Sequence, residues 1–191
     1  MQKFLKTLAL SSAVALATAT ASYAASHAAK PNPTVGGAAM PSNKNIIENA
    51  VNSPVHKTLV AAVKAAGLVD TLMGEGPFTV FAPTDDAFAA LPSGTVETLL
   101  KPENKDQLAT VLTCHVVAAN AMSDAIATMI ADDKGMHPVT TVGGCVFNAK
   151  MDGDAIVLID GQGREAKVTI ADVAQSNGVI HVIDSVLLPA G

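Results

Sequence analysis

Hydrophobic side chains in the first half of the chain recur at helical spacing. Apolar residues three or four positions apart run through 45–50 and 56–66, and Gly67 follows where a helix C-cap is expected. The run at 78–82 is instead typical of a strand. Further short helices are predicted at 68–73, 87–91, 96–100, 106–112 and 123–131. This half therefore predicts several helices around one strand.

After Pro138 the pattern changes to short runs rich in β-branched residues. These runs predict strands at 139–142, 145–151, 155–159, 166–170 and 179–183. Asp-Gly turns at 152–154 and 160–163 separate consecutive runs. The last run is apolar at nearly every position, which is typical of a central strand covered on both faces. Helices followed by consecutive strands predict an α+β domain with one mostly antiparallel sheet.

The N-terminal residues 1–24 have the order of a cleavable signal peptide. Two lysines precede an apolar stretch at 8–21, and small residues stand at Ser22 and Ala24, so we expect cleavage between Ala24 and Ala25. A membrane anchor is the competing interpretation, but the stretch is shorter than the roughly 18–20 residues of a spanning helix and contains hydroxyl groups. The mature protein is expected to be exported, periplasmic or extracellular, without a transmembrane anchor.

Residues 25–43 offer almost no large apolar side chain and contain three prolines and a Gly pair. This Pro/Ala/Gly-rich composition predicts a disordered leader, because it cannot bury enough apolar surface to offset the entropy of folding. The remaining residues, 44–190, are enough for one domain with one core.

The mature chain is acidic. Removal of the signal peptide takes away Lys3 and Lys6, so 10 Lys and Arg side chains face 17 Asp and Glu side chains. The chain also has no Trp and no cluster of basic residues. Nucleic-acid binding is therefore excluded as a function class, because it needs positive charge along the backbone and aromatic surfaces for stacking.

Cys114 and Cys145 both remain in the mature chain. Disulfides persist in exported proteins, so a bond between them is the favoured interpretation. It would close a loop of about 32 residues and contribute about 3.5–4 kcal/mol in the chain-entropy model. Two buried free thiols are the alternative. The spacing excludes a local C-x-x-C redox pair.

Two segments carry more specific information, and the first is 78–88. Pro83 ends the strand and Thr84 stands at the N-cap of the next helix. Asp85 and Asp86 then place carboxylates at the positive end of the helix dipole. A catalytic carboxylate pair is the alternative, but adjacent residues at a helix start point in different directions, so capping is favoured.

The second segment is 177–189. Asn177 and Gly178 predict a turn, and the apolar strand that follows carries His181 and leads to Asp184. Together with 112–117, which contains His115, the two segments resemble the three signatures of the fasciclin (FAS1) domain family. The resemblance runs in the expected order over nearly all of the mature domain and is closest to single-domain secreted bacterial fasciclin proteins.

The resemblance implies a FAS1-like wedge of mostly antiparallel β-strands with helices packed along its side. It also implies cell adhesion or another extracellular or envelope interaction, without catalysis. Where the family usually has a tyrosine before the histidine, this chain has Cys114. An adhesive role tied to that tyrosine-histidine pair is therefore not carried over to Cys114 and His115, and the replacement is expected to pair with Cys145.

His115 and His181 are each flanked by apolar residues. We expect both rings to fill core positions and to bond backbone carbonyls or a carboxylate such as Asp184. A metal site is a weak alternative, since the two histidines have no companion ligand at short spacing. His56 and His137 are interpreted as surface or turn residues. No catalytic residue, metal or cofactor is expected.

Three functions stay open. The favoured one is an exported, non-enzymatic domain that binds protein or polysaccharide components of the envelope, a matrix or a partner cell. The alternative is a periplasmic small-molecule or metal carrier that uses a pocket near His115 and His181. A purely structural envelope protein is the third. The sequence leaves the ligand and the oligomeric state open.

Overall fold

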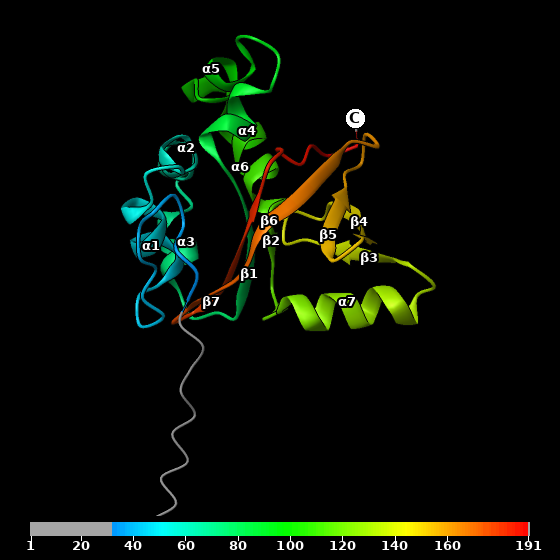
Figure 1. Ribbon diagram of the computed structural model, residues 1–191. Coiled ribbons are helices and arrows are strands. Elements are labelled where there is room, and N and C mark those ends of the chain that lie inside the picture. The colour runs from blue at the N-terminus through cyan, green and yellow to red at the C-terminus, as the bar shows by residue number, and fades with distance from the viewer. Residues whose placement is uncertain (1–31, 191) are drawn as a thin grey trace, which may run out of the picture. The chain divides into compact units, whose positions relative to one another are not determined.

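The computed structural model describes residues 32–190. This region contains short helices and a single seven-stranded sheet (Figure 1). The helices are α1 (Ile46–Asn52), α2 (Lys57–Ala66), α3 (Val69–Met73), α4 (Asp85–Ala89), α5 (Thr95–Leu99), α6 (Lys105–Thr113) and α7 (Ser123–Asp132), with a 3-10 turn η1 (Pro102–Asn104). The strands are β1 (Phe78–Pro83), β2 (Val116–Val117), β3 (Met136–Thr140), β4 (Val146–Asp152), β5 (Ala155–Ile159), β6 (Glu165–Gln175) and β7 (Gly178–Ile183).

The strands lie in the order β2-β1-β7-β6-β5-β4-β3. Only the β1–β7 pair is parallel, with Phe78 opposite Gly178 and Pro83 opposite Ile183. All other pairs are antiparallel. All six β7 residues are buried, because the strand has a neighbour on each side and helices or side chains over both faces. The predicted α+β class, the mostly antiparallel sheet and the central position of the strand predicted at 179–183 are confirmed.

Hydrophobic clusters lie on the two faces of the sheet. On one face α1, α2, α4 and α6 pack over β1 and β7, with Ile180 and Val182 pointing toward them. On the other face Ile183 of β7 and Phe81 of β1 pack with α7 and strands β4 to β6. Figure 1 shows α1 to α3 and α7 on opposite sides of the central strands. Successive side chains of β1 and β7 point to opposite faces of the sheet, so each strand contributes to both hydrophobic clusters.

A disulfide links the two ends of the sheet. Cys114, just before β2, is bonded to Cys145, just before β4, as predicted. Beside the bond, the backbone N–H of Val142 donates to the Val116 carbonyl at 2.8 Å, and that of Gly143 donates to the Thr113 carbonyl at 3.1 Å. The β3–β4 loop is thus fastened to the first edge strand by covalent and hydrogen bonds together.

Replacing both Cys114 and Cys145 by serine is expected to lower the free energy of unfolding by about 3 kcal/mol, a central value for native disulfides. The bond lowers the entropy of the unfolded chain, and the serines restore that entropy. Urea denaturation of oxidised wild type and of the double variant measures the difference, with a reducing agent as a second route to the open form. Equal midpoints for all three samples would contradict the prediction.

The predicted disorder of 25–43 is wrong for the part that the structure describes. In 32–43, Val35 and Met40 are 2% and 4% exposed and belong to the core. The side chain of Asn32 donates to the Ala174 carbonyl at 2.7 Å and accepts from the Ala174 N–H at 3.1 Å. Two anchoring hydrophobic residues and one amide are enough to order a segment whose composition alone predicts disorder. We call residues 32–43 the strap.

Residues 1–31, which include the predicted signal peptide and the cleavage site at Ala24 and Ala25, lie outside the described residues. Within 32–190, no helix has the length and apolar character that crossing a bilayer requires.

Candidate functional site

The first signature segment, 78–88, joins β1 to two helices. The Thr84 hydroxyl accepts from the Ala87 N–H at 3.3 Å and so caps α4, as its position predicted. The Asp85 carboxylate instead caps α2, because it accepts from the N–H groups of Thr58 at 2.7 Å and Lys57 at 3.3 Å. Asp86 is exposed. The two carboxylates therefore diverge.

Burial alone would raise the pKa of Asp85, but the bonds from the Thr58 and Lys57 N–H groups outweigh it and lower the pKa. Asp85 therefore stays ionised, which suits a helix cap and not a proton donor.

His115 is 2% exposed, and both of its ring nitrogens are bonded to the backbone. Nδ1 donates to the Val111 carbonyl at 2.8 Å, and Nε2 accepts from the Leu187 N–H at 2.9 Å. Burial lowers the pKa of this histidine to about 4, against the opposing effects of the Val111 carbonyl and Asp160. The neutral ring connects the end of α6 to the C-terminal segment after β7.

His181 is fully buried in β7 and is bonded in the same manner. Nε2 donates to the Ala121 carbonyl at 2.8 Å, and Nδ1 accepts from the Asp172 N–H at 3.3 Å. Its ring stacks on Phe81, with centroids 5.6 Å apart. Burial lowers its pKa. The expected backbone carbonyl is present, but Asp184 is not the partner: its carboxylate accepts from the Lys167 N–H at 2.8 Å.

The two histidines lie on either side of Phe81. The Phe81 N–H donates to the His115 carbonyl at 2.9 Å, and Phe81 is opposite His181 in the parallel pair. Because all four ring nitrogens are occupied by protein groups, neither ring has a lone pair available to a metal ion. Among the described residues, no group of three or more His, Cys, Asp or Glu side chains is placed to hold one.

A narrow apolar crevice of about 30 Å³ lies between α1, α2, α3 and strand β1. It reaches His115 but not His181, and its rim includes the exposed side chain of Lys64. The volume is that of about one water molecule. The carrier hypothesis needs a pocket that both histidines line. This crevice does not meet that requirement, because it reaches only His115.

Ser176 and Asn177 form the turn between β6 and β7, and Gly178 is the first residue of β7, so the predicted Asn177-Gly178 turn lies one residue earlier. The Asn177 side chain accepts from the Ile46 N–H at 3.1 Å and donates to the carbonyls of Leu72 and Gly74 at 2.9 and 3.0 Å. It thereby joins the start of α1 to the end of α3. Gly178 lies directly against β1, so that a Cβ atom there would overlap the Phe78 carbonyl oxygen.

Gly178→Ala is expected to lower the free energy of unfolding by roughly 2–3 kcal/mol, because the backbones of β1 and β7 must separate to admit a methyl group. Gly153→Ala is the matched control: Gly153 has φ +60° but open space around its Cβ position, and the change is expected to cost about 1 kcal/mol. Thermal unfolding of both variants tests this. A larger loss at Gly153 would show that backbone contact is not the constraint.

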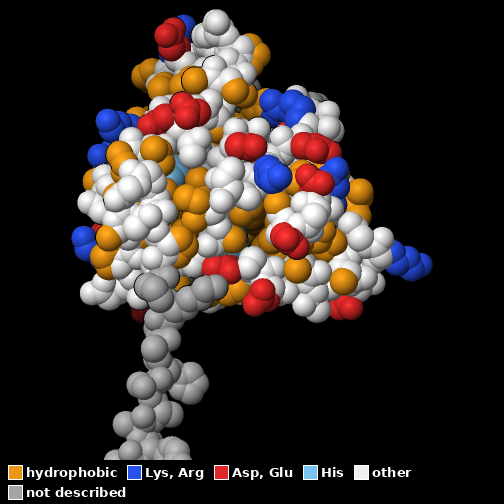
Figure 2. All heavy atoms as spheres, in the orientation of Figure 1, with side chains coloured by type: hydrophobic (Ala, Val, Ile, Leu, Met, Phe, Trp, Pro, Cys, Tyr) orange, Lys and Arg blue, Asp and Glu red, His pale blue; other side chains and the backbone are white. Residues whose placement is uncertain are grey.

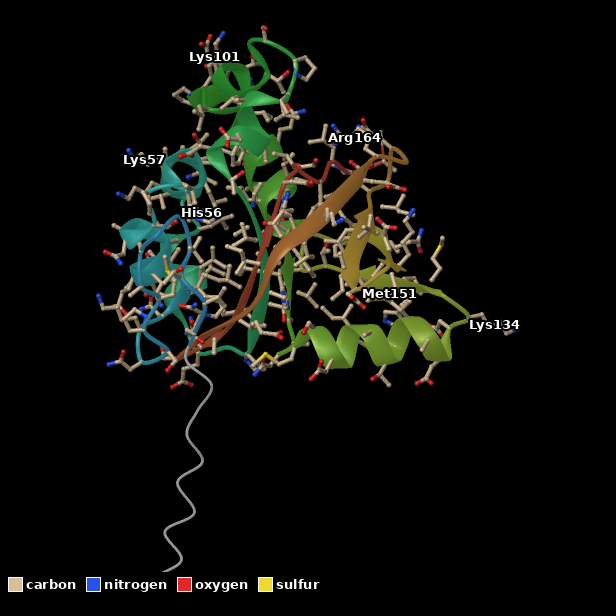
Figure 3. The ribbon with its side chains drawn as sticks, in the orientation of Figure 1. His56, Lys57, Lys101, Lys134, Met151 and Arg164 are labelled. Atoms are coloured by element: carbon tan, nitrogen blue, oxygen red, sulfur yellow. A yellow bond between two sulfur atoms is a disulfide. The ribbon has the colours of Figure 1, made fainter. Side chains whose placement is uncertain are left out.

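Sequence reasoning missed Asp160, which it placed in a hairpin turn only. Its side chain is 2% exposed and pairs with Arg164 at 2.6 Å. The carboxylate also accepts from the N–H groups of Gln162 and Arg164, both at 2.9 Å, and of Leu188 at 3.0 Å. Arg164, at the upper end of the sheet in Figure 3, in turn donates to the Val186 carbonyl at 3.1 Å.

Burial opposes ionisation of Asp160, but the bonds from Leu188 and Arg164 prevail and lower its pKa. The sequence signal that could have found this residue is its place before Gly161, where Asp commonly bonds the backbone two residues on.

Sequence reasoning also placed His56 on the surface, and this is wrong. The residue is 3% exposed and stands at the N-cap position just before α2 (Figure 3). Its Nδ1 lies 2.8 Å from the Ser53 hydroxyl. Burial lowers its pKa, partly offset by the Ala82 carbonyl and by Asp85. Val35 and Met40 of the strap line the same small cavity as His56, together with residues of α1, α2 and β1.

Comparison with known proteins identifies the class. The family model for the fasciclin domain matches residues 54–189, and the chain belongs to this family. Protein sll1483 of Synechocystis sp. is 49% identical over 160 residues, which cover 81% of this chain and 79% of that protein. Immunogenic protein MPB70 of Mycobacterium bovis is 36% identical over 150 residues, covering 73% of this chain and 66% of that protein.

Animal proteins match over a smaller part of their own length. Transforming growth factor-beta-induced protein ig-h3 of Sus scrofa is 34% identical over 131 residues, 69% of this chain but 17% of that protein. Among solved structures, the FAS1 domain pair of the insect cell adhesion molecule Fasciclin I superposes with a TM-score of 0.53 and 25% identity, covering 69% of this chain and 44% of that one. The FAS1-like fold is thus confirmed.

Proposed function

We propose that this protein is an exported, non-enzymatic interaction domain that mediates adhesion to the envelope, a matrix or a partner cell. The observation that carries the proposal is the inward orientation of the family signatures. The polar side-chain atoms of His115, His181 and Asn177 are hydrogen-bonded to backbone groups of the domain itself. They support the fold, so binding falls to the outer surface. The insect relative of known structure is a cell adhesion molecule.

The β3–β4 hairpin is the part of the surface that we propose for contact. Of the seven exposed large hydrophobic residues in 32–190, four belong to it: Met136, Val142, Val146 and Met151. Val142 and Val146 are 49% and 53% exposed and flank Cys145, whose disulfide holds this loop to the rest of the domain. A rigid, apolar and exposed loop is typical of a contact surface.

This surface favours a protein partner over a polysaccharide. Its exposed large hydrophobic residues are Val and Met, whereas sugar rings are commonly bound on aromatic faces. Over the face shown in Figure 2, acidic and basic side chains are scattered among hydrophobic and uncharged ones. The partner is therefore expected to bring a complementary apolar patch to the hairpin.

The experiment couples the mature chain, from Ala25, to beads and measures binding to the envelopes of the source organism and to host matrix proteins. The variant V142D/V146D places two charges on the hairpin and is expected to abolish saturable binding. The matched control is Val51→Asp, since Val51 is 56% exposed but lies on α1. All three changes are at exposed positions, so stability is expected to change by less than about 0.5 kcal/mol per site.

Equal loss of binding in the hairpin variant and in the control would refute the hairpin as the contact surface. Saturable binding by neither wild type nor variants would refute adhesion to these surfaces. Elemental analysis of the native protein then tests the carrier hypothesis, which predicts a stoichiometric metal. An abundant protein with neither partner nor metal would support a structural role in the envelope.

A further inference from the structure

An open groove of about 470 Å³ lies at the end of the sheet where β6 turns into β7. Its walls come from four places in the chain: Asn45 at the start of α1, the segment 73–77 at the end of α3, Asn120, and the turn 175–178. The volume is within the roughly 300–1,000 Å³ that ligand sites occupy. Of the described residues that line it, none belongs to the β3–β4 hairpin, so the groove is separate from the proposed contact surface.

The residues of this groove are mostly uncharged and polar. Asn45 and Asn120 bring amide groups and Ser176 brings a hydroxyl group, and Asn120 and Ser176 are exposed. Among the described residues that line the groove, Glu75 alone is charged, and it is exposed as well. Amides and hydroxyls can donate to and accept from a peptide backbone, and a carboxylate attracts a cation. The groove therefore suits a peptide segment that carries positive charge.

The strap begins and ends beside this groove. At its first residue, the side chain of Asn32 is bonded to the N–H and the carbonyl of Ala174, and the next residue of β6, Gln175, lines the groove. Just after its last residue, the carbonyl of Lys44 accepts from the N–H of Ser176 at 2.9 Å. The part of the chain that precedes Asn32 is therefore joined to the domain next to the groove.

Residues 25–31 suit the groove in length and in charge. Their sequence is Ala-Ser-His-Ala-Ala-Lys-Pro, and seven residues reach at most roughly 23–25 Å from Asn32. After the expected cleavage before Ala25, the segment has a positive α-amino group and Lys30 but no acidic side chain. Its covalent link to Asn32 makes docking intramolecular, so weak individual contacts are sufficient.

We propose that this groove is the docking site for residues 25–31 of the same chain. The main chain of the segment bonds the polar side chains of Asn120 and Ser176, and its cationic groups face Glu75. Docking extends the ordered strap to the mature N-terminus and closes the groove to other ligands. Because the α-amino group of Ala25 exists only after cleavage, removal of the signal peptide completes the contact.

Nitrogen-15 relaxation of the mature chain, from Ala25, tests the proposal. Backbone order parameters of residues 26–30 are expected at about 0.8 in the wild type and below about 0.6 in Glu75→Lys, which repels the segment. Glu103→Lys is the matched control: it makes the same charge change at an exposed position in η1, outside the groove, and the order parameters stay unchanged. Values below about 0.6 in the wild type, or equal values in wild type and Glu75→Lys, would overturn the proposal.

Through-space proton contacts in the wild-type mature protein provide a second test that does not depend on a variant. We expect nuclear Overhauser contacts between residues 26–30 and Asn120 or Ser176, with the same intensity per molecule over a wide range of protein concentration. Contacts that grow with concentration would place the segment of a second copy in the groove, and contacts elsewhere on the domain would place the segment outside it. Either result would overturn docking by the same chain.

Discussion

Asp160→Ala is expected to lower the free energy of unfolding by about 5 kcal/mol, the largest effect of any single substitution proposed for this protein. The carboxylate is the common acceptor for the backbone N–H groups of Gln162, Arg164 and Leu188 and for the Arg164 guanidinium. Alanine leaves these donors without their acceptor at a site whose side chain is 2% exposed. The β5–β6 turn and the C-terminal segment would then lose their connection.

Asp154→Ala is the control for this substitution. Asp154 lies in the neighbouring β4–β5 turn and is exposed, so its removal is expected to change the free energy of unfolding by less than about 0.5 kcal/mol. Chemical denaturation of the three proteins, with equal slopes in denaturant, measures both values. A loss below about 2 kcal/mol at Asp160 would mean that water replaces the carboxylate at little cost, contrary to its burial.

Acidification from pH 7 to pH 4 is expected to destabilise the domain by at least roughly 3 kcal/mol, the contribution of His115 alone. The folded state holds its ring neutral, with a pKa of about 4, while in the unfolded chain the pKa is 6.5. The unfolded state therefore binds more protons between these values, and stability falls as the pH falls. Above pH 6.5 the contribution is complete.

His56 and His181 also make the domain less stable as the pH falls, since burial lowers the pKa of each. Asp85 and Asp160 also have lowered pKa values, but their stabilisation is lost only below 3.8, the pKa of an unfolded Asp, and therefore below this range. Denaturation midpoints measured at half-unit steps of pH give the slope. His115→Gln removes one titrating group and should reduce that slope, and a stability independent of pH over this range would contradict the burial of these rings.

Much of the fold could be predicted because its signals are local. Gly67 does end α2, in the left-handed conformation, and Thr84 does cap α4. The order of helices and strands, the central apolar strand and the pairing of Cys114 with Cys145 also follow from spacing and composition. These features depend on residues close in sequence or on few possible partners, so one sequence was sufficient.

The boundaries that were wrong depend on pairing. Residues 139–142 were predicted as a strand, but β3 extends from Met136 to Thr140 across Pro138. Proline, which has no backbone N–H, is tolerated there because β3 is an edge strand and has a hydrogen-bonded neighbour on one side only. Strand β6 was predicted to end at 170 but continues to Gln175. Its pairing with β7 is irregular between Ile170 and Val173, and this irregularity accommodates Asp172, which has φ 59°.

For the signature residues, the sequence indicated which positions to examine, and the tertiary structure determined what their side chains contact. Thr84, His115, Asn177 and His181 are recognisable from the sequence, because the polar residues of the family signatures stand at defined places beside strands. The partner of Thr84 is only 3 residues away and could be predicted. The partners of Asp85 and Asn177 are 27 and 131 residues away, so only the fold could show that Asp85 caps α2 or that Asn177 joins α1 to α3.

The sequence by itself determined the α+β class, the family and the cysteine pair, since each rests on periodicity or on the identity of a few residues. Only the tertiary structure decided that the strap is ordered, that His56 is internal and that Asp160 is a buried anchor. Burial depends on what packs against a residue from elsewhere in the chain, and no local pattern contains that information. His56 is the clearest example, because the cavity that it lines is formed by residues of the strap, α1, α2, β1, β6 and β7 together.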